Sequence, residues 1–80
     1  MQKSISTGNY AHFLAHLREE RERSGVTQEE MAARLGESQS FVSKCERGER
    51  RMDVVELREF CKAMGLTLEK FVKQLECGMR

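Results

Sequence analysis

Apolar residues recur along most of the chain at steps of three and four positions, which places them on one face of an α-helix. The strict alternation of apolar and polar residues that is typical of a half-buried strand does not appear, and the chain contains no proline. Glycines interrupt the helical pattern at four places where a helix is expected to end: Gly25, Gly36, Gly48 and Gly65. The pattern therefore predicts an all-α fold with five helices.

Residues that can cap a helix stand before the later helical segments, namely Thr27, Ser38, Asp53 and Thr67. Thr27 and Asp53 are each followed three residues later by a glutamate, which is the spacing of a capping box. We expect helices over about 10–24, 28–35 and 39–47, a fourth between Asp53 and Gly65, and a fifth from Thr67 to about Glu76. Residues 1–9 would then form a flexible arm, residues 10–76 the domain, and residues 77–80 a short tail.

The segment 27–46 has the spacing that two short helices joined by a tight turn require. Ala32 is small enough to lie where the helices cross, and Gly36 can adopt the positive φ of the turn. Val42 and Cys45, six and nine residues after this glycine, would fill the angle between the helices. This spacing predicts a helix-turn-helix.

The same region resembles the Cro and phage-repressor type of helix-turn-helix, also called the xenobiotic-response-element (XRE) family, in two stretches: Gly25-Val-Thr-Gln-Glu-Glu-Met-Ala-Ala-Arg-Leu-Gly36 and Ser38-Gln-Ser-Phe-Val-Ser-Lys-Cys-Glu-Arg-Gly48. The resemblance extends from about His12 to Phe71 and implies a five-helix, lambda-repressor-like domain. Glu37 departs from the family pattern because it stands in a place that is more often apolar. Cys45 also departs from it by replacing a larger aliphatic residue, and we expect Phe41 to compensate by packing against the fourth helix.

The resemblance implies that the helix over 39–47 is a recognition helix, which reads base edges in the major groove of DNA. The expected base contacts come from Gln39, Ser40, Ser43 and Lys44, which share the side of the helix opposite Val42 and Cys45. Glutamine can bond adenine N6 and N7, lysine can donate to guanine O6 and N7, and serine suits several base edges. The alternative is that these residues only cap and solvate the helix.

Contacts with DNA phosphates are expected from Gln28, Arg47, Arg50 and Arg51. By resemblance, Gln28 bonds a phosphate at the N-terminus of its helix and braces the recognition helix. The three arginines form a local basic footprint that would fix the position of the protein without reading sequence. The alternatives are an ordinary exposed first-turn residue for Gln28 and a solvated charge run for the arginines.

Arg21 and Glu46 are expected to form a structural ion pair. Arg21 continues the face of Leu14 and Leu17 on the first helix, and Glu46 lies four residues after Val42 on the third. Matching positions in the family form a partly buried salt bridge, and a planar guanidinium suits two hydrogen bonds to one carboxylate.

Length and composition narrow the remaining classes of function and of bound group. The 80 residues suffice for one domain with no separate ligand-sensing domain, and the net charge of +1 argues against a protein that coats nucleic acid without regard to sequence.

The three cysteines, Cys45, Cys61 and Cys77, are odd in number and widely spaced, so we expect reduced thiols, two of them packed as small apolar groups. His12 and His16 lack a third ligand, so we expect a surface stripe rather than a metal site.

The sequence offers no candidate for catalysis or for a bound cofactor. No Ser–His–Asp, Cys–His or paired-carboxylate arrangement and no phosphate-binding glycine loop can be found, which argues against an enzyme. No stretch approaches the length of a membrane span, and no secretory pattern opens the chain. The expected location is therefore the cytoplasm.

We expect a sequence-specific transcriptional regulator, a repressor that binds a palindromic operator as a homodimer, because two half-sites multiply specificity. The dimer contact is expected on the fifth helix at Phe71, Val72 and Leu75; the alternative is that all three pack internally. A second hypothesis is a protein-interaction module, such as the antitoxin that binds a toxin and its own promoter. A third is an accessory subunit of an enzyme, which the polar recognition helix argues against.

Overall fold

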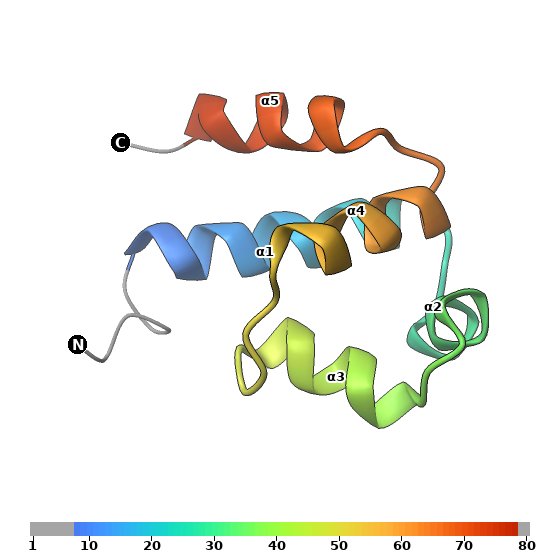
Figure 1. Cartoon of the computed structure of the whole chain (residues 1–80). Helices are drawn as coiled ribbons and strands as arrows, with labels where there is room; N and C mark the ends of the chain where they lie inside the picture. The colour runs from blue at the N-terminus through green and yellow to red at the C-terminus, as the bar shows by residue number, and fades with distance from the viewer. Residues whose placement is uncertain (1–7, 79–80) are drawn as a thin grey trace.

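The computed structural model describes residues 8–78, which form five α-helices joined by short loops (Figure 1). The helices are α1 (Gly8–Arg23), α2 (Gln28–Leu35), α3 (Gln39–Arg47), α4 (Val54–Ala63) and α5 (Leu68–Gly78). No strand occurs among these residues, so the expected all-α, five-helix fold is confirmed. Of the expected arm and tail, residues 1–7 and 79–80 lie outside the described part of the chain.

The outer ends of α1 and α5 lie beyond the limits that the sequence predicts. α1 begins at Gly8, so the last two residues of the expected arm are helical. The ring of Tyr10 packs against that of Phe13 with centroids 5.4 Å apart, which supports this first turn. α5 continues to Gly78, two residues later than expected, and this residue lies directly against His12: a Cβ there would be 2.5 Å from the imidazole. A ring contact within α1 thus accompanies its earlier start, and a contact with α1 accompanies the later end of α5.

The starts of α2, α3 and α4 are confirmed at the predicted caps. Thr27 Oγ1 accepts from the amide of Glu30 at 3.0 Å, and the Glu30 carboxylate accepts from the Thr27 amide at 2.9 Å. Asp53 and Glu56 form the same reciprocal pair at 2.8 and 3.1 Å, and Ser38 caps α3. These bonds satisfy first-turn amides that have no partner within the helix.

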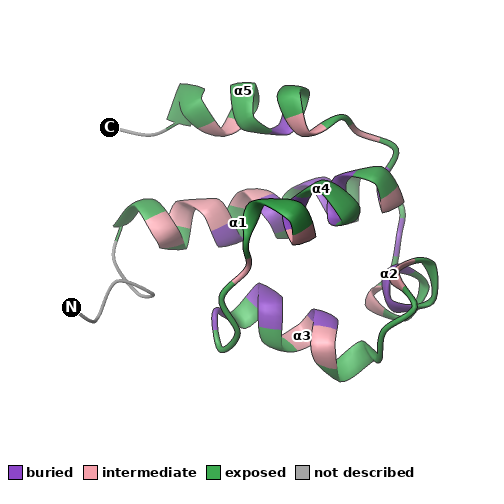
Figure 2. Cartoon of the chain, in the orientation of Figure 1, coloured by how far each residue is buried: buried purple, intermediate pink, exposed green. Residues whose placement is uncertain are grey.

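The core is formed by inward faces of all five helices. α1 packs against both α3 and α5, so these two helices lie on opposite sides of it, while α4 packs against α2 and α5 (Figure 1). Figure 2 shows the buried positions on the facing sides of the helices. The most deeply buried side chains are Leu17, Met31, Val42, Cys45, Phe60, Cys61 and Phe71.

Two expectations about α1 are wrong. His12 and His16 do not form an exposed stripe, because both are half-buried beneath α5, where the ring of His16 lies 4.5 Å from that of Phe71. Glu20 belongs to the charged run 18–23, whose pattern apart from Arg21 predicts a solvated helix face, but it is only 4% exposed, and it accepts a hydrogen bond from Arg23. α5 covers the histidines in space, and a sequence pattern confined to α1 does not reveal that cover.

The thiols follow the expected division into two buried and one exposed. Cys45 and Cys61 are fully buried and free, whereas Cys77 is free and exposed on α5. Burial, aided by the charge of Glu20, raises the pKa of the Cys61 thiol to about 11. Within residues 8–78, no three potential metal ligands cluster, and no helix combines the length and apolar character needed to cross a bilayer.

Candidate nucleic-acid interface

The turn between α2 and α3 sets the direction of α3. Gly36 ends α2 with φ of 72°, and its amide and that of Glu37 return to carbonyls of the last turn, with Glu37 N 2.9 Å from Ala32 O. Ala32 is 4% exposed at the crossing, and Val42 is completely buried against the core from α3. This arrangement holds the two helices at a fixed angle, as a helix-turn-helix requires.

The outer face of α3 presents the side chains that the sequence marks as base contacts. Gln39, Ser40 and Lys44 are exposed, and Ser43 is half-buried. Val42 and Cys45, on the opposite side of the helix, are buried, and Figure 2 shows this division along α3. The exposed set combines an amide, hydroxyls and an ammonium group, so the face can both donate hydrogen bonds to base edges and accept them.

A chain of hydrogen bonds connects this face to the core. Arg21 donates from Nε and Nη2 to the two oxygens of Glu46, at 2.5 and 3.1 Å, and from Nη1 to the carbonyl of Val26 at 2.9 Å. Glu46 Oε1 also accepts from Gln28 Nε2 at 3.0 Å. Gln28 Oε1 in turn accepts from Gln39 Nε2 at 3.4 Å. The first side chain of α3 is therefore braced through α2 to an arginine of α1.

The innermost pair of this chain is nearly sealed from water. Arg21 is 8% exposed and Glu46 is 4% exposed. The hydrogen bond to Glu46 raises the pKa of the Arg21 guanidinium against the opposing effect of burial, so the guanidinium remains charged. Because removal of one partner would leave the other charge buried and unpaired, the pair fixes α1 to α3.

A hollow of about 300 Å³ lies beside the braced residues, at the junction of α1, α2 and α3. It is lined by Arg18, Arg21, Gln28, Ser43, Glu46 and Arg47. Arg18 is exposed here and was not singled out by the sequence, since it belongs to a run that reads as a solvated helix face. Its place three residues before Arg21, on the same side of α1, is the signal that could have found it. The hollow brings cationic and amide donors together, as a phosphate oxygen requires.

The three arginines after Lys44 are all engaged in the free protein. Arg47 pairs with Glu49, and Arg50 pairs with Glu56. The Arg50 guanidinium also lies 4.8 Å from the centre of the Phe41 ring. The Arg51 guanidinium lies 4.7 Å from the centre of the Tyr10 ring on α1. The basic footprint thus consists of cations that already have partners, and the carboxylates of Glu49 and Glu56 lower its effective charge.

Phe41 takes the place that the sequence predicts for it. It is half-buried, and its ring lies 6.4 Å from the ring of Phe60 on α4. It therefore packs against the fourth helix beside the small side chain of Cys45, as expected.

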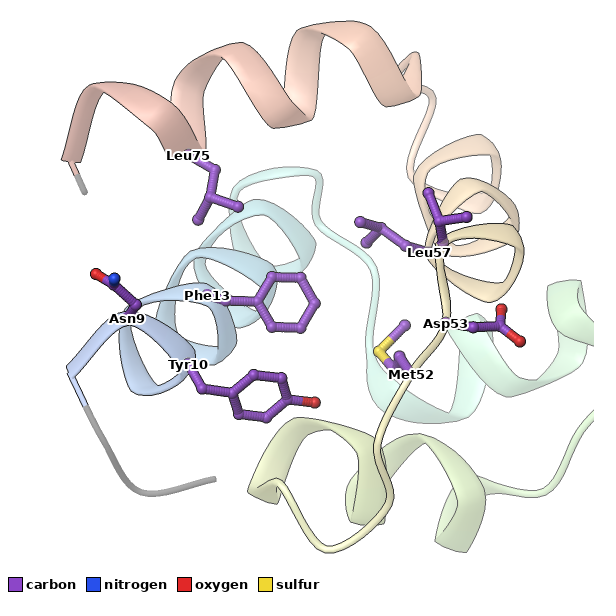
Figure 3. A pocket seen from close by; sticks show the side chains of 8 residues that line it. Asn9, Tyr10, Phe13, Met52, Asp53, Leu57 and Leu75 are labelled. Carbon is purple, nitrogen blue, oxygen red and sulfur yellow. The ribbon is translucent and has the colours of Figure 1, made fainter. Parts of the chain in front are cut away.

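The residues expected at a dimer contact separate in the structure. Phe71 is fully buried in the core of its own chain, so its inclusion in a contact surface is wrong. Val72 is 42% exposed and Leu75 is half-buried. Leu75 borders an apolar groove of about 300 Å³ between α1, α5 and the start of α4, to which Tyr10 and Phe13 also contribute (Figure 3).

Two more apolar side chains stand beside this groove. Val54, which lines it, and Val55 are 63% and 64% exposed in the first turn of α4. With Val72, they are the large apolar residues left most exposed within residues 8–78. A protruding apolar pair next to an apolar recess is a surface that a second protein can cover.

Comparison with known proteins agrees with the fold. Residues 12–78 match the family described as helix-turn-helix domain. Over 47 residues the chain is 45% identical to an uncharacterized HTH-type transcriptional regulator, y4dJ, of Sinorhizobium fredii, and the match covers 59% of this chain and 61% of that protein. The chain therefore matches less than two thirds of that relative's length.

Two solved structures resemble the whole domain. An XRE-family like protein from Pseudomonas syringae is 44% identical, with a TM-score of 0.85, and the match covers 98% of this chain and 95% of that chain. The clp gene regulator ClgR from C. glutamicum is 25% identical, with a TM-score of 0.78, and the match covers 94% of this chain and 97% of that one.

Proposed function

This chain belongs to the helix-turn-helix domain family, of the XRE type, and on that premise we propose that it represses transcription by binding a palindromic operator as a homodimer. The observation that carries the proposal is the polar outer face of α3, whose first side chain is braced to the core through Gln28 and Glu46. Repression needs only that the operator be occupied, so it requires no surface beyond the DNA interface and a dimer contact.

α3 lies in the major groove in this proposal. Gln39 and Ser40 stand in its first turn, with Ser43 and Lys44 one turn further along. The four positions supply an amide, two hydroxyls and an ammonium group, and a good bidentate pair discriminates a base by about 1–3 kcal/mol. Gln39 is suited to adenine and Lys44 to guanine.

Phosphates flank the groove contacts. The hollow lined by Gln28, Arg18 and Arg47 takes one phosphate, close to the N-terminus of α2, where helix amides favour an anion. Arg50 and Arg51 reach neighbouring phosphates. Arg50 must leave the carboxylate of Glu56 to do so, and Arg51 lies over an aromatic ring in the free protein. These contacts fix the register of α3 and carry no sequence information.

The dimer contact is built from Val72, Leu75 and the valines at the start of α4. A two-fold interface requires that one patch be complementary to itself. The protruding Val54 and Val55 of one copy can enter the apolar groove of the other, and the reverse contact is made at the same time. This surface replaces the contact expected from the sequence, which included the buried Phe71.

The test is selection of bound duplexes from a random-sequence library by the purified protein at physiological salt, where weak nonspecific binding is suppressed. We expect a palindrome whose half-sites are centred about ten base pairs apart. Gln39→Ala should then relax one base position in each half-site while the protein stays folded. If a folded protein enriches no sequence, the proposal is wrong, and a search for protein partners becomes the next step.

A further inference from the structure

The C-terminal end of α3 contains a hydrogen-bonded cluster that connects two of the proposed DNA contacts to a carboxylate. Arg47 donates to Glu49 through two nitrogens, Nε to Oε2 at 2.9 Å and Nη2 to Oε1 at 3.2 Å. Its remaining nitrogen, Nη1, donates to Ser43 Oγ. In the free protein each of the three guanidinium nitrogens of Arg47 therefore donates a hydrogen bond.

The turn after α3 places Glu49 where it can reach this arginine. Gly48 has φ of 81°, and the amide of Glu49 returns to the carbonyl of Lys44 at 2.9 Å, which closes the helix. The side chain of Glu49 makes no other hydrogen bond within the described part of the chain. Both partners face water, since the side chains of Arg47 and Glu49 are 53% and 55% exposed.

The neighbouring pair of Arg50 and Glu56 differs because it is tied to the surrounding structure. Glu56 also accepts from the amide of Asp53, as part of the capping box of α4, and Arg50 lies over the ring of Phe41. Breaking this pair would disturb the start of α4. Breaking the pair of Arg47 with Glu49 would disturb no helix and no core contact.

We propose that Glu49 is a built-in competitor for DNA phosphate, which holds Arg47 in the free protein and must be displaced before that guanidinium binds a duplex. The inference rests on the proposed function, because it concerns the same DNA interface. The chain has a net charge of only +1, so a carboxylate that cancels one interface cation removes a substantial part of the attraction to DNA.

Because a phosphate carries no sequence information, the competition acts on every duplex alike. Glu49 therefore lowers affinity for operator and nonspecific DNA by the same factor. It also reduces the number of counterions released on binding, because the paired arginine contributes less than a full charge to the interface. Both effects are measurable without knowledge of the regulated genes.

The experiment compares Glu49→Gln with Glu69→Gln as a matched control. Both substitutions remove one carboxylate charge from an exposed position, and Glu69 lies on α5, on the opposite side of α1 from α3. Binding of the selected operator and of a scrambled duplex of equal length is measured by fluorescence anisotropy at salt concentrations between about 50 and 200 mM. Thermal unfolding of each variant is recorded in parallel.

We expect E49Q to tighten binding of both duplexes about two- to fivefold per protomer beyond E69Q, as loss of an exposed ion pair allows. The slope of log affinity against log salt should steepen by up to about 0.9 per protomer, with the operator preference and unfolding temperature unchanged.

Equal affinities for E49Q and E69Q, with the wild type still binding its operator, would overturn the role of Glu49 and leave the proposed function intact. A change in operator preference in E49Q would also overturn it, since a phosphate competitor cannot alter base readout. If the folded wild type binds neither duplex, the proposed function itself is wrong and this inference is wrong with it.

Discussion

Individual side chains around α3 divide into those that hold the helix in place and those that face outward from it. Arg21 and Glu46 belong to the first group, since both are almost fully buried and bonded to each other through two nitrogens. Gln39 and Lys44 belong to the second group and are exposed. Substitutions in the first group should therefore lower the free energy of unfolding, whereas substitutions in the second group should leave it nearly unchanged.

Arg21→Leu should destabilise the domain by about 3–5 kcal/mol, because it leaves the carboxylate of Glu46 buried without its charged partner. Gln39→Ala should change the unfolding free energy by less than about 0.5 kcal/mol, as is usual at an exposed site. Urea denaturation followed by circular dichroism measures both values. Equal losses in the two variants would contradict the division between supporting and contacting residues.

Residue roles were predictable from the sequence only where they depend on a fixed spacing. The family resemblance implies the pairing of Arg21 with Glu46, and the structure contains it. The partners of Arg47 and Arg50 could not be predicted, because they depend on how the turn after Gly48 directs the chain. The burial of Glu20 could not be predicted either, because it depends on contacts outside α1.

At the scale of helices, the turn between α2 and α3 depends on backbone conformation rather than on side-chain packing. A Cβ at Gly36 would meet no atom within 4 Å, yet its φ of 72° lies in the left-handed region. A substitution there should therefore cost only the backbone strain. Gly8, at the start of α1, has equally open surroundings without a positive φ, so it offers a matched control.

Gly36→Ala should destabilise the domain by about 1–2 kcal/mol and lower the melting temperature by roughly 4–8 °C for each kcal/mol. Gly8→Ala should leave the melting temperature unchanged or slightly raised, since alanine favours a helix. Differential scanning calorimetry gives both numbers. A loss of the same size at Gly8 would mean that the cost is not specific to the left-handed turn.

Helix boundaries were predictable where local chemistry sets them. The caps at Thr27, Ser38 and Asp53 start their helices through bonds within four residues, which a sequence shows directly. Both α1 and α5 were predicted too short at their outer ends. Gly78 of α5 lies against His12 of α1, and the first turn of α1 is supported by the contact between the rings of Tyr10 and Phe13. Local signals therefore predict the inner boundaries better than the outer ones.

At the scale of the whole molecule, the two proposed interfaces use different elements. α3 and α5 pack on opposite sides of α1, so the proposed dimer surface, which includes α5, can be altered without touching α3 (Figure 1). The apolar groove beside Leu75 (Figure 3) is also lined by Val54, and Val55 is exposed in the same turn of α4.

Replacing both Val54 and Val55 by glutamate should convert a dimer to a monomer, because it places charges on an apolar contact. Acidic residues are favourable in the first turn of a helix, so α4 should remain folded. Sedimentation velocity measures the state of each variant. The matched control is Ala15→Glu with Ala33→Glu, two exposed positions outside the groove that add the same charge.

We expect the control variant to remain dimeric and to bind a palindromic duplex as the wild type does. The valine variant should bind a single half-site but lose the added affinity of the palindrome, which comes from linking two contacts. A wild-type protein that sediments as a monomer would contradict the homodimer proposal. A valine variant that still dimerises would place the contact on another surface.

The hydrogen-bond chain that ends at Gln39 has a consequence for how readily the binding preference could change. A glutamine already held by Gln28 loses less conformational entropy when it meets a base than a freely rotating side chain would. In the proposed complex with DNA, a change of the base that Gln39 reads would therefore require a joint change of Gln28 and Gln39. Ser40 and Lys44 are outside this chain of hydrogen bonds, so the bases proposed for them could change one substitution at a time.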